Sequence, residues 1–321
     1  MTAEPRRARV RALAKINLSL RVLNKRPDGF HELRTIFQTI SLADSLDIEF
    51  TPARRTVMEL DSSVDIADNL VLRAARLTME AMKKTGAVRF RLRKRIPMGG
   101  GLGGGSSDAA AVLLALPVLA GRDLPLETLV RLGSELGSDV PFFLLGGTAL
   151  GLGRGEEVLP LPEAPAMRGV VAAPGVAIST AEAYRALGRE LTSGPESSNM
   201  NSFRALLWNL GSGLTAEAWA ALGENDFASF VYESYPKVDR VRRKLRRLGA
   251  KPVMLSGSGS SVVGVFGDRN QEEQARRSFR EQQVESFYLV SRARYRSLWW
   301  RSLMGRLKGK EQWPPRSRYA R

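Results

Sequence analysis

Apolar and polar residues alternate along three stretches of the first half of the chain, and each stretch predicts a half-buried strand. The clearest covers residues 10–23, where the apolar residues stand at every second position. A second strand is expected over 35–50, with a bend near Asp44. In the third stretch, residues 88–92, apolar residues alternate with arginine, which predicts one face in contact with solvent.

Elsewhere the spacing of apolar residues changes to three or four. Over residues 69–82 this predicts a helix with Asp68 as its N-cap, and a second helix is expected over 106–119. The second half of the chain alternates between the two patterns, so we expect an α+β protein. Its predicted elements are a helix over 238–248, a strand over 252–267 interrupted by Gly257 and Gly259, a helix over 271–282 and a strand over 285–290.

Prolines mark a boundary between two domains. Four of them fall between residues 160 and 174, in a stretch that is typical of a linker. We therefore expect one domain over residues 1–160 and a second over 161–291. Residues 292–321 are expected to form an extension beyond the fold.

The composition is that of a folded protein without cysteine chemistry. The chain has 321 residues, of which 43% are hydrophobic and 26% charged, enough for two domains with cores of their own. It has no cysteine, which excludes disulfides, thiolate metal ligands and a cysteine nucleophile. No apolar run approaches the roughly 18 residues of a membrane span, and the charged N-terminus lacks the apolar stretch of a secretion signal. A cytoplasmic location is expected.

The net charge of +16 is concentrated in the C-terminal extension. Residues 292–321 contain ten Lys or Arg and one acidic residue, so they carry +9, and the remaining 291 residues carry about +7. Three of the five tryptophans also lie there, interleaved with arginine. A solvated extension is the favoured interpretation, because its apolar residues share a helical face with charged ones. Packing on the protein's own domain and binding to an anionic surface are the alternatives.

The stretch PMGGGLGGGSSDAA, residues 97–110, holds six glycines in seven positions directly before a predicted helix. Glycine costs roughly 0.5–1 kcal/mol in ordered structure, so the run needs a function. It lacks the lysine of a P-loop, and the strand before it alternates with arginine, unlike the apolar first strand of a dinucleotide-binding fold. Bare backbone before a helix N-terminus instead predicts a site where several N–H groups approach an anion.

This stretch resembles the phosphate-binding motif of the GHMP kinases, a superfamily that includes galactokinase, homoserine kinase and mevalonate kinase. Three further stretches resemble motifs of that family in the same order: AKINLSLRVLNKRPDGFHEL at 14–33, GSDVPFFLLGGTALGLGRGE at 137–156 and MLSGSGSSVVGVF at 254–266. The resemblance spans about residues 9–290. It implies an α+β fold of two domains, the N-terminal one like the second domain of ribosomal protein S5 and the C-terminal one ferredoxin-like.

The resemblance implies that ATP is the phosphate donor and that Mg²⁺ arrives as part of the nucleotide complex. The implied acceptor is the 2-hydroxyl of a cytidine-diphosphate-linked methylerythritol, in the non-mevalonate route to isoprenoid precursors. No carboxylate cluster suggests a dedicated metal site, and Asp108 is at most an outer contact. The expected nucleotide-binding residues form the whole loop: Pro97, Met98, Gly99, Gly100, Gly101, Leu102, Gly103, Gly104, Gly105, Ser106 and Ser107.

Lys15 and Asp139 are the predicted catalytic residues. By resemblance, Lys15 lies beside Asp139 and the acceptor hydroxyl. Asp139 stands at the entry to an apolar run, where a partly buried carboxylate must be paired or functional. We expect Asp139 to accept the hydroxyl proton while Lys15 holds the local charge. A solvent-facing lysine and a turn-capping aspartate are the alternatives without a catalytic role.

The resemblance also assigns the residues that bind the substrate. His31, the single histidine, and Phe30, which stands where the family usually has tyrosine, would contact the cytosine. Tyr184 would close the other side of the base. The remaining expected contacts are polar or glycine residues: Asn17, Thr180, Gly257 and Ser258.

Two other functions are considered. Another GHMP kinase, acting on homoserine or mevalonate, would have no need for the aromatic–histidine pair in RPDGFHEL, because its substrate lacks a nucleobase. A nucleic-acid-binding module would suit the basic charge, but it has no use for a phosphate loop together with Lys15 and Asp139. We therefore expect a small-molecule substrate and no nucleic acid for the folded body. The sequence leaves the oligomeric state open between a monomer and a weak dimer.

Overall fold

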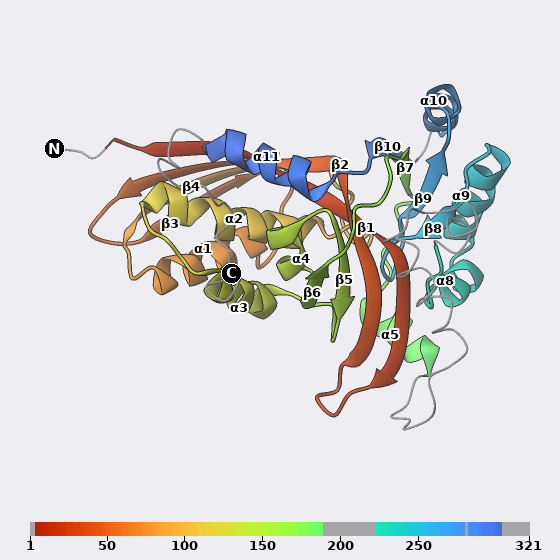
Figure 1. The fold of residues 1–321 in the computed structure, drawn as a ribbon, viewed down its shortest axis with the longest axis horizontal. Coiled ribbons are helices and arrows are strands. Elements are labelled where there is room, and N and C mark those ends of the chain that lie inside the picture. Colours follow the sequence, from red (N-terminus) through yellow and green to blue (C-terminus); the bar gives the residue numbers. More distant parts are fainter. Residues whose placement is uncertain (1–3, 189–222, 280–281, 304–321) are drawn as a thin grey trace.

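The computed structural model describes residues 4–188, 223–279 and 282–303, which form two sheets with helices packed on them (Figure 1). The first sheet has six strands, in which β1 pairs with β2 and the remaining order is β3-β4-β2-β5-β6. Its strands are β1 (Arg6–Lys25), β2 (His31–Pro52), β3 (Val57–Ser62), β4 (Gly86–Arg93), β5 (Thr148–Leu152) and β6 (Glu157–Pro160).

The long hairpin of β1 and β2 connects the two halves of the molecule. Its antiparallel register shifts between Leu13, opposite Ala43, and Lys15, opposite Thr39, so β2 has extra residues at this point. Such an irregularity bends the strand and redirects the side chains that follow. The bend expected near Asp44 lies here, and Lys15 is the first residue of β1 beyond it.

Four helices cover one face of this sheet: α1 (Leu70–Ala81), α2 (Gly104–Ala120), α3 (Leu126–Leu136) and α4 (Val140–Leu145). The N-cap of α1 is Asn69, whose side chain accepts a hydrogen bond from the Val71 amide, so the prediction of Asp68 was wrong by one residue. Asp68 instead adopts a positive φ just before the helix.

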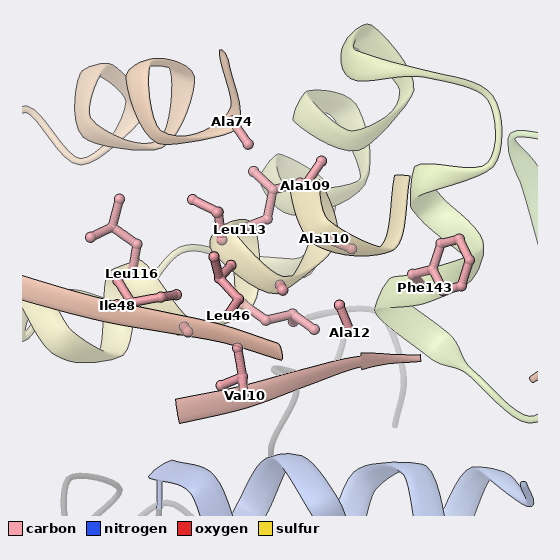
Figure 2. Packing of buried hydrophobic residues seen from close by; sticks show 14 of the residues in the cluster. Val10, Ala12, Leu46, Ile48, Ala74, Ala109, Ala110, Leu113, Leu116 and Phe143 are labelled. Carbon is pink, nitrogen blue, oxygen red and sulfur yellow. The ribbon is translucent and has the colours of Figure 1, made fainter. Parts of the chain in front are cut away.

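Helix α2 is the centre of the first core. All of its residues from Ser107 to Ala120 are buried, as expected for a helix that is apolar all round. Figure 2 shows Leu113 between Ala74 of α1 and the strand residues Val10 and Leu46. The helix that follows the glycine loop is therefore held on several sides, and its N-terminus has a fixed position.

The second sheet has the order β10-β7-β9-β8 and all of its pairings are antiparallel. Along the chain its strands and helices alternate in the ferredoxin-like manner, which confirms the predicted C-terminal fold. The elements are β7 (Arg168–Ala173), α5 (Thr180–Leu187), α8 (Ala228–Ser234), α9 (Pro236–Arg247), β8 (Val253–Leu255), β9 (Val262–Phe266), α10 (Arg269–Ser278) and β10 (Gln283–Tyr288). The chain passes from the first sheet to the second between residues 160 and 168.

The C-terminal segment corrects one expectation. Residues Arg292–Leu303 form helix α11, which packs against β1, so they are not a solvated extension. Tyr295, Trp299 and Leu303 recur along one helical face and are buried in the first core. Of the charged residues interleaved with them, Arg294 and Arg301 are exposed, whereas Arg292 is partly buried and its guanidinium hydrogen-bonds to backbone carbonyls. The rest of the extension, residues 304–321, lies outside the described residues.

Candidate active site

A cleft of about 1010 Å³ lies between the two domains and collects the predicted site residues. Both predicted catalytic residues, Lys15 and Asp139, line it, as does Gly101 of the glycine loop. So do all of the predicted substrate-binding residues: Asn17, Phe30, His31, Thr180, Tyr184, Gly257 and Ser258. Side chains from β1, from the β1–β2 connection, from α5 and from the β8–β9 turn thus face one space.

The glycine loop leads directly into α2, with Gly103 as its N-cap at a φ of 69°. The first hydrogen bond of the helix runs from the Ser107 amide to the Gly103 carbonyl, so the four amides from Gly103 to Ser106 have no partner within the helix. These amides, at the positive end of a 17-residue helix, make an anion site by geometry alone.

The two glycine motifs, far apart in sequence, meet in space. The Ser261 amide donates to the Gly100 carbonyl (3.2 Å), and the Ser256 hydroxyl donates to the Gly101 carbonyl (3.0 Å). A Cβ on Gly101 would lie 2.0 Å from the Ser256 carbonyl oxygen, closer than atoms can approach. Glycine is required here because the β8–β9 turn of the C-terminal domain packs directly against the loop.

Lys15 is buried at the floor of the cleft, with 3% of its surface exposed, so it is not a solvent-facing strand residue. Its Nζ lies 3.2 Å from Asp139 Oδ2 and donates to Asn17 Oδ1 at 2.8 Å. The ring of Phe37 lies beneath it, 5.3 Å from the ammonium nitrogen. The Lys15 amide donates to the Leu102 carbonyl (3.0 Å), which ties β1 to the glycine loop.

Asn17 connects Lys15 to the second domain. Its Oδ1 accepts from Lys15 Nζ and from the Gly257 amide (2.9 Å), and its Nδ2 donates to Thr35 Oγ1 (2.7 Å). An amide fixed by three partners has a single orientation. Asn17 therefore aligns Lys15 with the turn that carries Gly257 and Ser258.

Asp139 is the N-cap residue of α4, but its side chain makes no capping hydrogen bond. Its carboxylate is 32% exposed and turns into the cleft toward Lys15. A carboxylate beside a buried ammonium, with one side open to a bound molecule, can accept a proton from a hydroxyl that enters there. The alternative in which Asp139 serves as a structural cap does not fit this geometry.

Ser107 differs from what the loop motif suggested. Its hydroxyl donates to the Leu13 carbonyl (2.7 Å), and the side chain is buried. The hydroxyl faces the core rather than a phosphate, because position 107 falls on the side of α2 that packs on β1. Ser106, one position earlier, is half-buried and belongs to the free first turn of the helix.

A buried ionic cluster lies directly under the loop. Lys94 Nζ is bonded to Asp44 Oδ2 and to Asp108 Oδ2 (2.8 Å), and all three side chains are almost fully buried. Asp44 Oδ1 also accepts the amides of Arg95 (2.6 Å) and Ile96 (2.9 Å), so it fixes the chain just before the loop. Burial raises the pKa of Asp108 to about 7, aided by the Asp44 charge and opposed by Lys94.

Aromatic rings line the opposite end of the cleft. His31 and Tyr184 are stacked, with centroids 4.7 Å apart and planes 16° from parallel, and Tyr184 stands edge-on to Phe227. Phe30 is 52% exposed, and the guanidinium of Arg154 covers one face of its ring at 4.7 Å. The structure thus pairs Tyr184 with His31, and a base held between Tyr184 and Phe30 stays a prediction. Burial, with a contribution from Asp139, raises the pKa of Tyr184, so its hydroxyl stays protonated.

Thr180 and Ser258 approach each other across the cleft from α5 and from the β8–β9 turn, with their hydroxyl oxygens 3.1 Å apart. The turn itself is held by Asn225, whose Nδ2 donates to the carbonyls of Leu255 (3.1 Å) and Gly257 (2.8 Å). Both predicted hydroxyl contacts line the cleft.

Comparison with known proteins decides the family. The family model described as GHMP kinases N terminal domain matches residues 69–147, and the one described as GHMP kinases C terminal matches residues 207–285. A relative from Solibacter usitatus, named 4-diphosphocytidyl-2-C-methyl-D-erythritol kinase, is 57% identical over 98% of each chain. This chain belongs to the GHMP kinases.

Solved structures of two GHMP kinases differ in how similar they are to this chain. A crystal structure of 4-(cytidine 5'-diphospho)-2C-methyl-D-erythritol kinase is 37% identical, covers 88% of this chain and 99% of its own, and gives a TM-score of 0.73. The homoserine kinase of Cytophaga hutchinsonii gives a TM-score of 0.64 at 18% identity, over 89% of this chain and 95% of its own. The second match shows the shared fold alone. The chain therefore groups with the cytidine-diphosphate-linked kinases rather than with the homoserine or mevalonate kinases.

Several cleft residues of this GHMP kinase were missed by sequence reasoning. Arg154 stands between two glycines, which was a usable signal. Others contact the cleft only through the fold, among them Thr35, Phe37, Ser138, Arg185 and Phe227. Outside the cleft, Asp44 is a charge inside an apolar strand pattern, which is the usual sign of a buried, paired carboxylate.

Two negative findings concern the described part of the chain only. No helix there has the length and hydropathy needed to cross a membrane. No group of three or more acidic or histidine side chains gathers there as metal ligands. The acidic residue nearest the start of α2, Asp108, is already bonded to Lys94.

Proposed function

We propose that this chain transfers the γ-phosphoryl group of ATP to the 2-hydroxyl of 4-diphosphocytidyl-2-C-methyl-D-erythritol, giving the 2-phosphate and ADP. It acts in the non-mevalonate route to isoprenoid precursors, as its relatives' name and its own cleft support. The observation that carries the proposal is the Lys15–Asp139 pair, 3.2 Å apart, in one cleft with the glycine loop and the aromatic end. A cytoplasmic location belongs to the same proposal, because the reaction consumes ATP.

Phosphoryl transfer asks the protein mainly to position the reactants and to balance charge. In our proposal the amides of Gly103 to Ser106 hold the phosphates of ATP at the mouth of α2. The 2-hydroxyl lies against Asp139, which takes its proton as the hydroxyl oxygen bonds to the γ-phosphorus. The bond from the γ-phosphorus to the bridging oxygen breaks, and ADP leaves with that oxygen. Lys15 lies against Asp139 and offsets the negative charge that gathers at the reacting phosphoryl group.

The aromatic end supplies recognition of the cytidine. The stacked pair of His31 and Tyr184 offers a flat apolar surface together with imidazole and phenol hydrogen-bonding atoms. Phe30 lacks the hydroxyl that the family usually has here, but it keeps a ring, and Arg154 over that ring brings a positive charge into the cleft. A nucleobase with an attached diphosphate suits this surface, whereas mevalonate or homoserine would leave it unused.

Magnesium enters this proposal with the nucleotide. Among the described residues no three acidic or histidine side chains gather as a dedicated cage. We assign Mg²⁺ to the phosphates of the bound ATP, with which it is delivered to kinase sites. When bound, it neutralises charge on the phosphates.

The test is an assay of ADP release against a panel of acceptors. With ATP and Mg²⁺, the cytidine-linked alcohol should be phosphorylated with a kcat/KM at least ~10³-fold above that for mevalonate or homoserine, since the site is built for a group that they lack. Isothermal titration should show that the cytidine compound binds and that mevalonate and homoserine do not. A preference for mevalonate or homoserine, or ATP turnover that ignores the acceptor, would overturn the proposal.

A further inference from the structure

Helix α11 is an integral part of the first domain. Tyr295, Trp299 and Leu303 are each 3% exposed or less. In Figure 2 the helix (blue) lies on the side of β1 that faces away from α2. The solved cytidine-linked kinase matches along 99% of its own length but covers 88% of this chain, so this chain has length that the other lacks.

The start of α11 is bonded to the segment that follows α4. The Arg292 guanidinium donates to the carbonyls of Thr148 (2.6 Å) and Leu161 (3.1 Å), and the Arg292 amide donates to Glu163 Oε1 (2.8 Å). Just before it, the Val290 amide donates to the Thr39 carbonyl at 2.9 Å. The position of the helix is therefore set by several bonds to the first domain.

Tyr295 contacts the end of α4 in two ways. Its hydroxyl donates to the Phe143 carbonyl at 2.6 Å, which satisfies a group in the last turn of a helix of only six residues. Its ring covers Gly146, where a Cβ would lie 2.2 Å from a ring carbon. Burial raises the pKa of the Tyr295 hydroxyl, so it remains a donor at every pH at which the protein works.

The same short helix touches the reacting groups. Asp139 is its N-cap residue. The ring of Phe143 packs on Gly103 of the glycine loop, where a Cβ would lie 2.8 Å from it. The ring of Phe142 lies 4.9 Å from that of Phe37, which supports the Lys15 ammonium. A shift of α4 would thus move Asp139 relative to both the loop and the lysine.

We infer that Tyr295 is a positioning residue: by holding the last turn of α4 it fixes the carboxylate of Asp139 against the acceptor hydroxyl. The inference rests on the proposed function, because it assigns Asp139 the proton. Tyr295 itself lies outside the cleft and touches no substrate. Its removal should therefore alter the rate of the transfer and leave the binding of both substrates intact.

The test variant is Tyr295→Phe, which keeps the ring over Gly146 and deletes only the hydroxyl. We expect kcat to fall about tenfold, since small misplacements of a reacting group are costly, while the KM values for ATP and for the cytidine substrate stay within about twofold. The matched control is Leu303→Val, two turns further on the same buried face, which shortens a buried side chain. This control should lower the melting temperature and leave kcat unchanged.

The double variant Tyr295→Phe, Asp139→Asn separates positioning from general loosening. If Tyr295 acts through Asp139, the double variant is no slower than Asp139→Asn alone. An unchanged kcat in Tyr295→Phe, equal losses in both single α11 variants, or additive losses in the double variant would overturn the inference. None of these results would contradict the proposed function. That proposal fails instead if the unaltered enzyme does not phosphorylate the cytidine substrate.

Discussion

At the phosphate end of the cleft, where Lys15 and the glycine loop lie, Lys15 is 3% exposed and hydrogen-bonds to Asn17 and to the Leu102 carbonyl. At the aromatic end of the cleft, called the base end below, Phe30 is 52% exposed, and the rings come from the β1–β2 connection and from α5. The first end is fixed by the cores of both domains, and the second is an aromatic surface at the rim.

This difference separates two tasks. Groups that act in the transition state must be positioned before the substrates arrive, which a buried network achieves. A nucleobase needs a flat surface and a few hydrogen bonds, which the exposed ring of Phe30 and the half-buried rings of His31 and Tyr184 can provide. Changes at the phosphate end should therefore appear in kcat or in the use of ATP, and changes at the base end in KM for the cytidine substrate.

The largest effect is expected from Asp139→Asn. The amide keeps the shape but cannot accept the proton, so kcat should fall at least ~10²-fold with both KM values little changed. Steady-state kinetics, with circular dichroism to verify the fold, measure this. Near-normal turnover would show that Asp139 does not take the proton. It would also contradict the division of tasks between the two ends of the cleft.

The next largest effect is expected where the glycine loop packs against the β8–β9 turn. Gly101→Ala places a Cβ 2.0 Å from the Ser256 carbonyl, whereas Gly99→Ala has a similar positive φ but meets nothing within 4 Å. We expect kcat/KM for ATP to fall some tens of fold in the first variant, because the loop must move by a sizeable fraction of an ångström. The second should lose only the modest stability that a positive φ costs. Equal losses in the two variants would show that backbone strain at a positive φ, and not the contact with Ser256, causes the effect.

At the base end, Tyr184→Ala removes the ring that stacks on His31. KM for the cytidine substrate should rise about tenfold, in the range of one lost aromatic contact, while kcat and KM for ATP stay near their original values. Tyr184→Phe, which keeps the ring, should stay within about threefold. A loss confined to kcat in Tyr184→Ala would contradict the assignment of recognition to this end.

At the phosphate end, the glycine run and the helix after it could be predicted from local rules. The roles of Lys15 and of the aromatic residues at the base end came from the family resemblance instead. Phe227 and Arg185 reach the cleft only because the second sheet folds back on the first, and no local pattern encodes that. Helix α11 was missed because Trp299 and Leu303 were judged together with charged residues beyond position 303, and without strand β1, on which the helix packs.

The smallest expected effect concerns the cluster under the loop. Burial raises the pKa of Asp108 from 3.8 to about 7, so between these values the folded protein binds more protons than the unfolded chain. The free energy of unfolding should therefore decrease as the pH rises from about 4 to about 7. Asp108→Asn removes this contribution, and urea titrations of the two proteins across that range should show a flatter dependence in the variant. Parallel curves would place the titrating proton elsewhere.

The central claim is that one hydroxyl, one carboxylate and one phosphate meet beside Lys15. A crystal structure with a non-hydrolysable ATP analogue and the cytidine-linked alcohol measures this directly. We predict that the 2-hydroxyl oxygen lies about 2.6–3.2 Å from an Asp139 oxygen, and that the amides at the start of α2 contact the phosphates. A 2-hydroxyl beyond the reach of Asp139, or a γ-phosphate bound away from the glycine loop, would contradict the account.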